Sequence, residues 1–191
     1  MEERNDQLRS FLEALEKRVP GEKAHADRVA VYATATGHQM EIRGEALFQL
    51  RCAATLHDVG KASLDPGPLL KIGSLTTEER SKMQAHVTLA EALVDAIEWL
   101  RPCIPAIRHH HERWDGGGYP DGLAGEAIPL FARIIAVGEA YDAMTFLSLG
   151  REPLTEEQAV EELEKESGGQ FDPLVVRAFL AVRPLIQPVV A

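Results

Sequence analysis

Apolar residues recur at intervals of three and four along almost the whole chain, and no stretch alternates apolar and polar residues. Residues 2–18, for example, place Leu8, Phe11 and Leu15 on one face of a helix that ends before Pro20. Strands repeat at every second residue, so this spacing leaves the helix as the expected element throughout. The chain is therefore predicted to be all-α and, since it has no internal repeat or long linker, to form a single domain.

Turn and capping residues set the ends of these helices. Thr76 and Glu79 are spaced as a capping box, as are Thr155 and Gln158. The expected helices cover approximately residues 2–18, 22–36, 44–57, 76–100, 105–111 and 130–144, with two more that begin after Thr155 and at Asp172-Pro173.

Composition excludes several classes of function. The chain has 191 residues and a formal net charge of −10, and no basic stripe offsets the acidic residues, which argues against binding to duplex nucleic acid. No apolar run approaches the ~18–20 residues that a membrane helix needs, and the N-terminal residues do not resemble a signal peptide. The two cysteines, Cys52 and Cys103, form no motif and suit a reducing cytosol, so a cytoplasmic location is expected.

Three of the seven histidines are consecutive, in the stretch HHHERWDGGGYPDG at residues 109–122. Three others, His25, His57 and His86, lie on or at the ends of expected helices, and Asp58 follows His57 directly. Helices from separate parts of a chain can bring such side chains together inside a bundle, where histidines and carboxylates build di-metal sites. One such histidine alone is more typical of a surface or core position. As a group, they favour a metal site.

Two segments resemble the signatures of the HD-GYP family, the branch of the HD metal-dependent phosphohydrolases that cleaves cyclic di-GMP. They are HDVGK (57–61) and HHERWDGGGYPDG (110–122), and the similarity runs in order through about residues 22–182. The resemblance implies a helical bundle of the HD-domain type over residues 22–191. The N-terminal helix, residues 1–21, falls outside it.

The resemblance also implies a di-metal site. Its ligands would be His25, His57, Asp58, His86, His110, His111 and Glu139. The carboxylate of Asp58 would bridge two ions about 3.5–4 Å apart. Imidazoles and carboxylates without thiolates suit transition metals such as iron or manganese, and zinc stays open. Some members bind a third ion through a Glu one turn before the first histidine; Gly21 stands at that position here and favours two ions.

The acidic ligand departs from the family pattern. The aligned residue in IAVGEAYDA (135–143) is Glu139, where the family usually has Asp. Glu can still bind metal, although its extra methylene shifts the carboxylate. Asp142, one turn later, matches a second acidic position of the family and is expected to be a helper or a structural residue. The family register thus predicts that Glu139, and not Asp142, is the ligand.

Substrate contacts follow from the same resemblance. The implied catalytic residues are Asp58 and Lys61, and the implied substrate-binding residues are Lys61, Gly118, Tyr119 and Arg151. The phosphate clamp departs from the pattern, because Ser148 and Gly150 stand where the family usually has Arg and Tyr. Loss of a charge-assisted phosphate contact costs about 1.5–3 kcal/mol. Substrate binding is therefore expected to be weaker than in relatives that keep the full clamp.

The implied activity is metal-dependent hydrolysis of cyclic di-GMP to pGpG, to GMP, or to both. One alternative is a non-catalytic domain that binds cyclic di-GMP or a protein partner, which Glu139 and Ser148 favour. Another is an HD phosphohydrolase that acts on a different nucleotide, which the Gly-Tyr-Pro loop disfavours. A homodimer and a signalling partner both stay open, and Met1 favours a stand-alone domain over a fragment.

Overall fold

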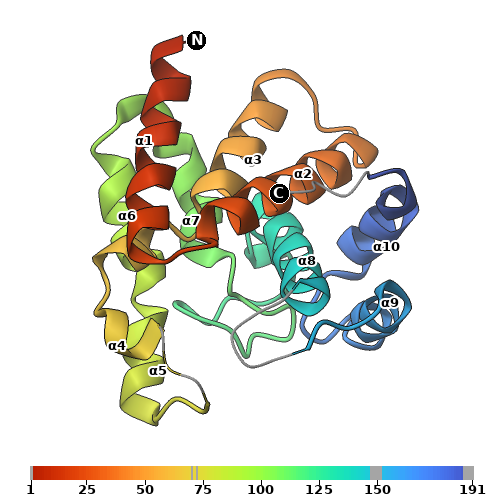
Figure 1. Cartoon of the computed structure of the whole chain (residues 1–191). Helices are drawn as coiled ribbons and strands as arrows, with labels where there is room; N and C mark the ends of the chain where they lie inside the picture. The colour runs from red at the N-terminus through yellow and green to blue at the C-terminus, as the bar shows by residue number, and fades with distance from the viewer. Residues whose placement is uncertain (1, 70, 72, 147–151, 187–191) are drawn as a thin grey trace.

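The computed structural model describes residues 2–69, 71, 73–146 and 152–186 (Figure 1). In chain order, its elements are α1 (Glu2–Arg18), α2 (Glu22–Gln39), α3 (Gly44–Leu56), η1 (Val59–Ser63), α4 (Pro66–Leu69), α5 (Thr77–Gln84), α6 (His86–Asp95), η2 (Glu98–Cys103), α7 (Ile104–His109), η3 (Gly125–Ala127), α8 (Leu130–Thr145), α9 (Glu156–Lys165), α10 (Pro173–Val182) and η4 (Arg183–Leu185), where η marks a 3-10 helix. α2 packs on α3, α8 and α10, while α6 packs on η1 and α7. In Figure 1, α8 lies between the side with α6 and α7 and the side with α9 and α10.

The all-α prediction is confirmed. Among the residues listed above as described, β pairing is limited to one isolated bridge between Ser167 and Phe171. Both predicted capping boxes form, at the N-termini of α5 and α9, and the Asp172 side chain caps α10. None of the helices in the described part of the chain is long and apolar enough to span a bilayer.

The single long helix predicted over residues 76–100 is wrong. The chain forms α5 and α6 with a break at Ala85, and then continues as the 3-10 helix η2. At the break, the His86 ring donates from Nδ1 to the Met83 carbonyl at 2.7 Å. An uninterrupted helix would use that carbonyl for the backbone N–H four residues later. The break turns the His86 side chain into the interior.

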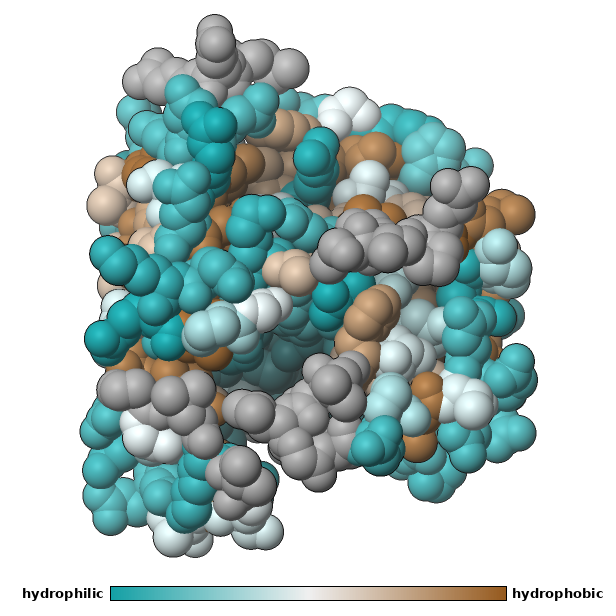
Figure 2. Space-filling model, in the orientation of Figure 1, coloured by the Kyte–Doolittle hydropathy of each residue, from teal (hydrophilic) through white to brown (hydrophobic). Residues whose placement is uncertain are grey.

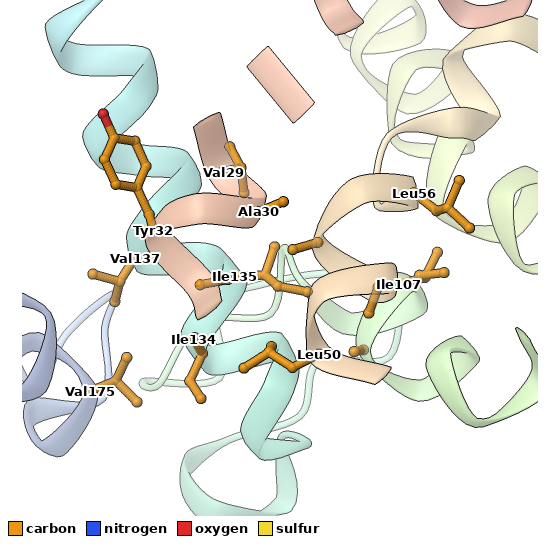
Figure 3. Close-up of a cluster of buried hydrophobic side chains, with 14 of the residues drawn as sticks. Val29, Ala30, Tyr32, Leu50, Leu56, Ile107, Ile134, Ile135, Val137 and Val175 are labelled. Atoms are coloured by element: carbon orange, nitrogen blue, oxygen red, sulfur yellow. The ribbon is translucent and has the colours of Figure 1, made fainter. Parts of the chain in front are cut away.

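The core lies where α2, α3, α7, α8 and α10 meet (Figure 3). Each of these helices contributes at least one fully buried apolar side chain, and five examples are Val29, Leu50, Ile107, Ile135 and Val175. Full burial of such a side chain stabilises a fold by about 1.5–3 kcal/mol. This core fixes the relative positions of the helices that carry the histidines.

Gly60 allows η1 to lie directly against α6. A Cβ at this position would lie 2.0 Å from the carbonyl oxygen of His86 and 2.6 Å from the backbone nitrogen of Ala90. Only glycine fits so close an approach of two backbones. The contact places Asp58, two residues earlier, beside His86.

The turn between α1 and α2 explains the glycine at position 21. Gly21 has φ 96°, a left-handed conformation that favours glycine. The Glu16 carboxylate accepts hydrogen bonds from the backbone N–H groups of Gly21 and Lys23, at 3.0 and 2.9 Å. Backbone geometry therefore accounts for the residue that stands where a third-metal Glu would be expected.

Candidate metal centre

All seven side chains expected to bind metal lie in one cluster. Their ligand atoms form two sets, and within each set the atoms lie within 4.8 Å of one another. The His25 group consists of His25, His57, Asp58 and Glu139. The His86 group consists of Asp58, His86, His110 and His111. The contributing segments are α2, the residues after α3, the first turn of α6, the residues after α7 and the middle of α8.

Asp58 belongs to both groups and is 1% exposed. Its Oδ1 lies 3.2 Å from His86 Nε2 and 3.9 Å from His110 Nε2. Its Oδ2 lies 3.2 Å from His57 Nε2 and 3.8 Å from His25 Nε2. Each carboxylate oxygen therefore faces a different pair of imidazoles, as a carboxylate that bridges two ions would.

Backbone carbonyls orient three of the rings. Nδ1 of His57, His86 and His110 donates in each case to the carbonyl three residues earlier, at 2.7 Å. A carbonyl only accepts, so Nε2 of each neutral ring keeps its lone pair. These three Nε2 atoms and both Asp58 oxygens are buried without a hydrogen-bond partner among the described residues. Asp58 Oδ2 also has the Lys61 ammonium 2.6 Å away. Buried polar atoms are almost always paired, so this cluster of acceptors without hydrogen bonds fits divalent cations.

The electrostatics of the cluster suit the same ligands. Burial alone would raise the pKa of the Asp58 carboxyl, but the Lys61 ammonium and the His57 imidazole hold it well below its usual range. Burial also lowers the pKa values of His86 and His110, most strongly for His110. Asp58, His86 and His110 therefore have the protonation state that metal binding requires, a negative carboxylate beside neutral imidazoles. His57 differs: burial alone would lower its pKa, but the Asp58 carboxylate raises it to about 9, so this ring must lose a proton when a metal ion binds.

Lys61 lies at the edge of the cluster. Its Nζ forms an ion pair with Asp58 Oδ2 at 2.6 Å, and it donates to both Glu22 oxygens at 3.2 and 3.4 Å. The Lys61 side chain is 17% exposed. It therefore presents a cation beside the ligands on a side that solvent reaches.

The cluster is closed on one side and accessible on the other. His57 and His110 are fully buried, whereas the side chains of His111 and Glu139 are 25% and 17% exposed. The Tyr119 ring stacks on His111 with its centroid 4.8 Å away. A cavity of about 150 Å³ adjoins His111 and Glu139. The face shown in Figure 2 is also hollowed near its centre, and hydrophilic residues line the hollow.

Comparison with known proteins gives the family. The family model described as "HD domain" matches residues 9–175, which is most of the chain. The chain belongs to the HD domain family. It is 34% identical over 190 residues to the cyclic di-GMP phosphodiesterase response regulator RpfG of Xanthomonas campestris. The aligned region covers 98% of this chain and 50% of that protein. It is 33% identical over 169 residues to 3'3'-cGAMP-specific phosphodiesterase 2 of Vibrio cholerae, which covers 87% of this chain and 32% of that protein.

This HD domain therefore spans half the length, or less, of those two relatives. Among solved structures, it matches V-cGAP3, a cyclic GMP-AMP specific phosphodiesterase of Vibrio cholerae, with a TM-score of 0.69 at 21% identity. That match covers 93% of this chain and 48% of the other. The likeness shows a shared all-α HD fold.

Glu139 contributes a ligand atom to the His25 group of this HD domain, and Asp142 does not. Asp142 Oδ2 instead lies 2.7 Å from His25 Nδ1, on the far side of that ring from Asp58. This geometry is compatible with Glu139 as the acidic ligand, a role that stays a prediction. The clamp positions Ser148, Gly150 and Arg151 lie outside the described residues.

Gly118, expected as a substrate contact, packs against its own chain. A Cβ at this position would lie 2.3 Å from the Arg113 nitrogen and 2.6 Å from the His111 carbonyl oxygen. The glycine therefore lets the loop of this HD domain fold back onto the residues after α7. That path places the next residue, Tyr119, on the His111 ring.

Sequence reasoning assigned no role to Glu112 or to His109, the histidine outside the family signature. Glu112 is buried, and its carboxylate accepts from the backbone N–H groups of Asp121 and Leu123 at 2.8 and 3.1 Å. His109 Nε2 lies 2.9 Å from Asp121 Oδ2, and Arg108 donates to both Asp121 oxygens at 2.9 Å. These contacts tie the glycine loop to α7. Glu112 lies inside the signature, but only the folded loop reveals the role of Asp121.

Replacing Glu112 with Gln should loosen this loop. The amide keeps one acceptor but turns an N–H group toward a backbone donor, and a buried unpaired polar group costs about 1–3 kcal/mol. We expect a lower thermal midpoint and faster hydrogen exchange of the amides of residues 116–123. Glu126→Gln, at an exposed position of η3, is the matched control. Unchanged exchange in the Glu112 variant would contradict the assigned role.

Proposed function

We propose that this HD domain is a metal-dependent phosphodiesterase that hydrolyses cyclic di-GMP. The observation that carries the proposal is the pair of ligand groups that share Asp58, with five buried ligand atoms that have no hydrogen-bond partner among the described residues. RpfG and a Thermotoga maritima relative, 34% identical over 172 residues, are both named cyclic di-GMP phosphodiesterases, which supports the substrate. Imidazole and carboxylate donors support two transition-metal ions, iron or manganese, as the cofactors.

Each group of side chains would have its own role in this reaction. The seven ligands would hold two ions, which when bound polarise phosphoryl oxygens and lower the pKa of a coordinated water. Lys61 would direct its ammonium toward a substrate phosphate, since its Nζ is already beside Asp58 and its side chain is partly exposed. Tyr119 would contact the dinucleotide at the accessible rim, where its ring is fixed on His111. Arg151 would supply a second phosphate contact.

The experiment is a turnover assay on protein prepared without oxygen and loaded with Mn²⁺ or Fe²⁺. Cyclic di-GMP and 3'3'-cGAMP are supplied separately, and pGpG, GMP and the mixed linear product are separated by chromatography. We expect faster hydrolysis of cyclic di-GMP. Faster hydrolysis of 3'3'-cGAMP would instead assign to this domain the substrate after which the Vibrio relative is named. Binding of cyclic di-GMP with no hydrolysis in any metal form would replace the enzyme by a binding domain.

Restoring the clamp arginine should improve catalysis. Ser148→Arg adds a charge-assisted phosphate contact of about 1.5–3 kcal/mol, and tighter positioning raises rate as well as affinity. We therefore expect kcat/KM for cyclic di-GMP to rise about tenfold or more. Ser81→Arg, which adds the same charge at an exposed position of α5, should leave kcat/KM unchanged. If both variants behave like the wild type, the clamp is not what limits this domain.

A further inference from the structure

His25 is held differently from His57, His86 and His110. Its Nδ1 lies 2.7 Å from Oδ2 of Asp142, a side chain on α8 that is 117 residues away in the sequence. A carboxylate accepts, so the ring donates from Nδ1 and keeps its Nε2 lone pair directed toward Asp58, 3.8 Å away. The orientation of this one ligand therefore depends on another side chain and not on its own helix.

Asp142 is in turn held by Arg28, one turn after His25 on α2. Arg28 Nε donates to Oδ1 at 2.6 Å, and its second terminal nitrogen donates to Oδ2 at 2.8 Å. The two side chains are 11% and 2% exposed. A bidentate pair of this kind fixes the plane of the carboxylate as well as its position. Asp142 is thereby committed to His25 and Arg28 and is not free to turn toward an ion.

The outer side of Arg28 is covered by Phe146, the residue after α8. The guanidinium carbon lies 3.8 Å from the centroid of the Phe146 ring, within the range of a cation–π contact. The guanidinium is therefore packed between a carboxylate and an aromatic face. This arrangement holds Arg28 in the one orientation that serves Asp142.

We propose that Asp142 and Arg28 are positioning residues for one of the two metal ions, the one bound by the His25 group. The inference rests on the proposed di-metal function and adds that the two ions depend on different supports, side chains for one and backbone carbonyls for the other. A carboxylate that accepts from the distal nitrogen of a ligand histidine fixes the ring and increases its basicity, and its loss typically costs 10–100-fold in metal affinity. In the His86 group, His86 and His110 take their orientation from backbone carbonyls, which no side-chain substitution removes.

The test is metal binding by the full chain, with and without these side chains. Asp142→Asn keeps an acceptor for His25 but removes the charge that Arg28 grips. Protein is equilibrated in a series of Mn²⁺ buffers, and bound metal per chain is measured by mass spectrometry. The wild type should bind two ions. Asp142→Asn should bind one ion as tightly as the wild type and the other about 10–100-fold more weakly. Arg28→Lys, which keeps the charge but not the bidentate grip, should weaken the same ion by a smaller factor.

The matched control is Asp172→Asn. Asp172 is 1% exposed, and it accepts from Arg133 at 2.6 Å in a pair as buried as that of Asp142 with Arg28. Asp172 belongs to neither ligand group. This variant should lose thermal stability and still bind both ions with unchanged affinity, which separates positioning from general loss of stability.

Two results would overturn the inference: unchanged affinity for both ions in Asp142→Asn, or an equal loss of both. Arg28→Lys decides by the same criteria if Asp142→Asn fails to fold, as judged by circular dichroism. Failure of the wild type itself to bind two ions would overturn the di-metal centre on which the proposed function also depends. Normal metal binding by the wild type without turnover would leave the positioning result intact and overturn the enzyme alone.

Discussion

Asp58→Ala should release both metal ions and abolish hydrolysis of cyclic di-GMP. Oδ1 faces His86 and His110 while Oδ2 faces His57 and His25, so one substitution removes a ligand from each ion. Bound ions contribute several kcal/mol to such a reaction, and each 1.36 kcal/mol is a factor of ten in rate. We expect kcat to fall at least about a thousand-fold. Metal content and product formation are measured on the same preparation.

Asp95→Ala is the control for this prediction. Asp95 is exposed at the end of α6, and its carboxylate pairs with Arg101 on the surface. Exposed pairs of this kind contribute little to stability, so both metal content and turnover should match those of the wild type. Retention of two ions by the Asp58 variant would show that Asp58 is not the bridging ligand.

Gly60→Ala should both destabilise the fold and disrupt the metal centre. The added methyl group would lie 2.0 Å from the His86 carbonyl oxygen and 2.6 Å from the Ala90 nitrogen, so η1 and α6 must separate. Overpacking of this kind costs about 1–3 kcal/mol, and each kcal/mol lowers the thermal midpoint by about 2–4 °C in a chain of this size. Separation also moves Asp58 away from His86. We therefore expect weaker binding of the ion held by the His86 group.

Gly67→Ala provides the comparison. Its added methyl group would meet only the Asp65 side chain, at an ordinary contact distance of 3.5 Å. Thermal midpoint and metal affinity should stay close to the wild-type values. A Gly60 variant that melts like the Gly67 variant and binds metal normally would mean that α6 can shift without consequence for the centre.

The helices and the set of candidate ligands could be predicted from sequence because their signals are local. Capping residues such as Thr155 and Asp172 act within one helical turn. The adjacent pairs His57-Asp58 and His110-His111 lie in short strings that identify the family. Helical ends and family signatures can both be read without knowing which helices meet.

Tertiary contacts set what could not be predicted. The break at Ala85 depends on the bond from His86 to a carbonyl, and nothing in the local spacing indicates it. Arg28 and Asp142 are 114 residues apart, and only the packing of α2 on α8 shows that they pair. Gly60 can be read as a loop glycine from sequence, whereas its physical reason is the backbone of another helix.

The hydrogen bonds from His57, His86 and His110 to backbone carbonyls affect which substitutions such a domain can accept. The residues three positions earlier are Ala54, Met83 and Ile107, a small, a flexible and a β-branched side chain, and all three supply the same carbonyl. The orientation of these three histidine rings therefore does not depend on which side chain stands three residues earlier. Many apolar core residues can then be substituted, with repacking, while the three rings keep their orientation. The orientation of His25 does depend on side chains. We therefore expect selection against substitutions to be stronger at Asp142 and Arg28 than at the three residues that supply carbonyls.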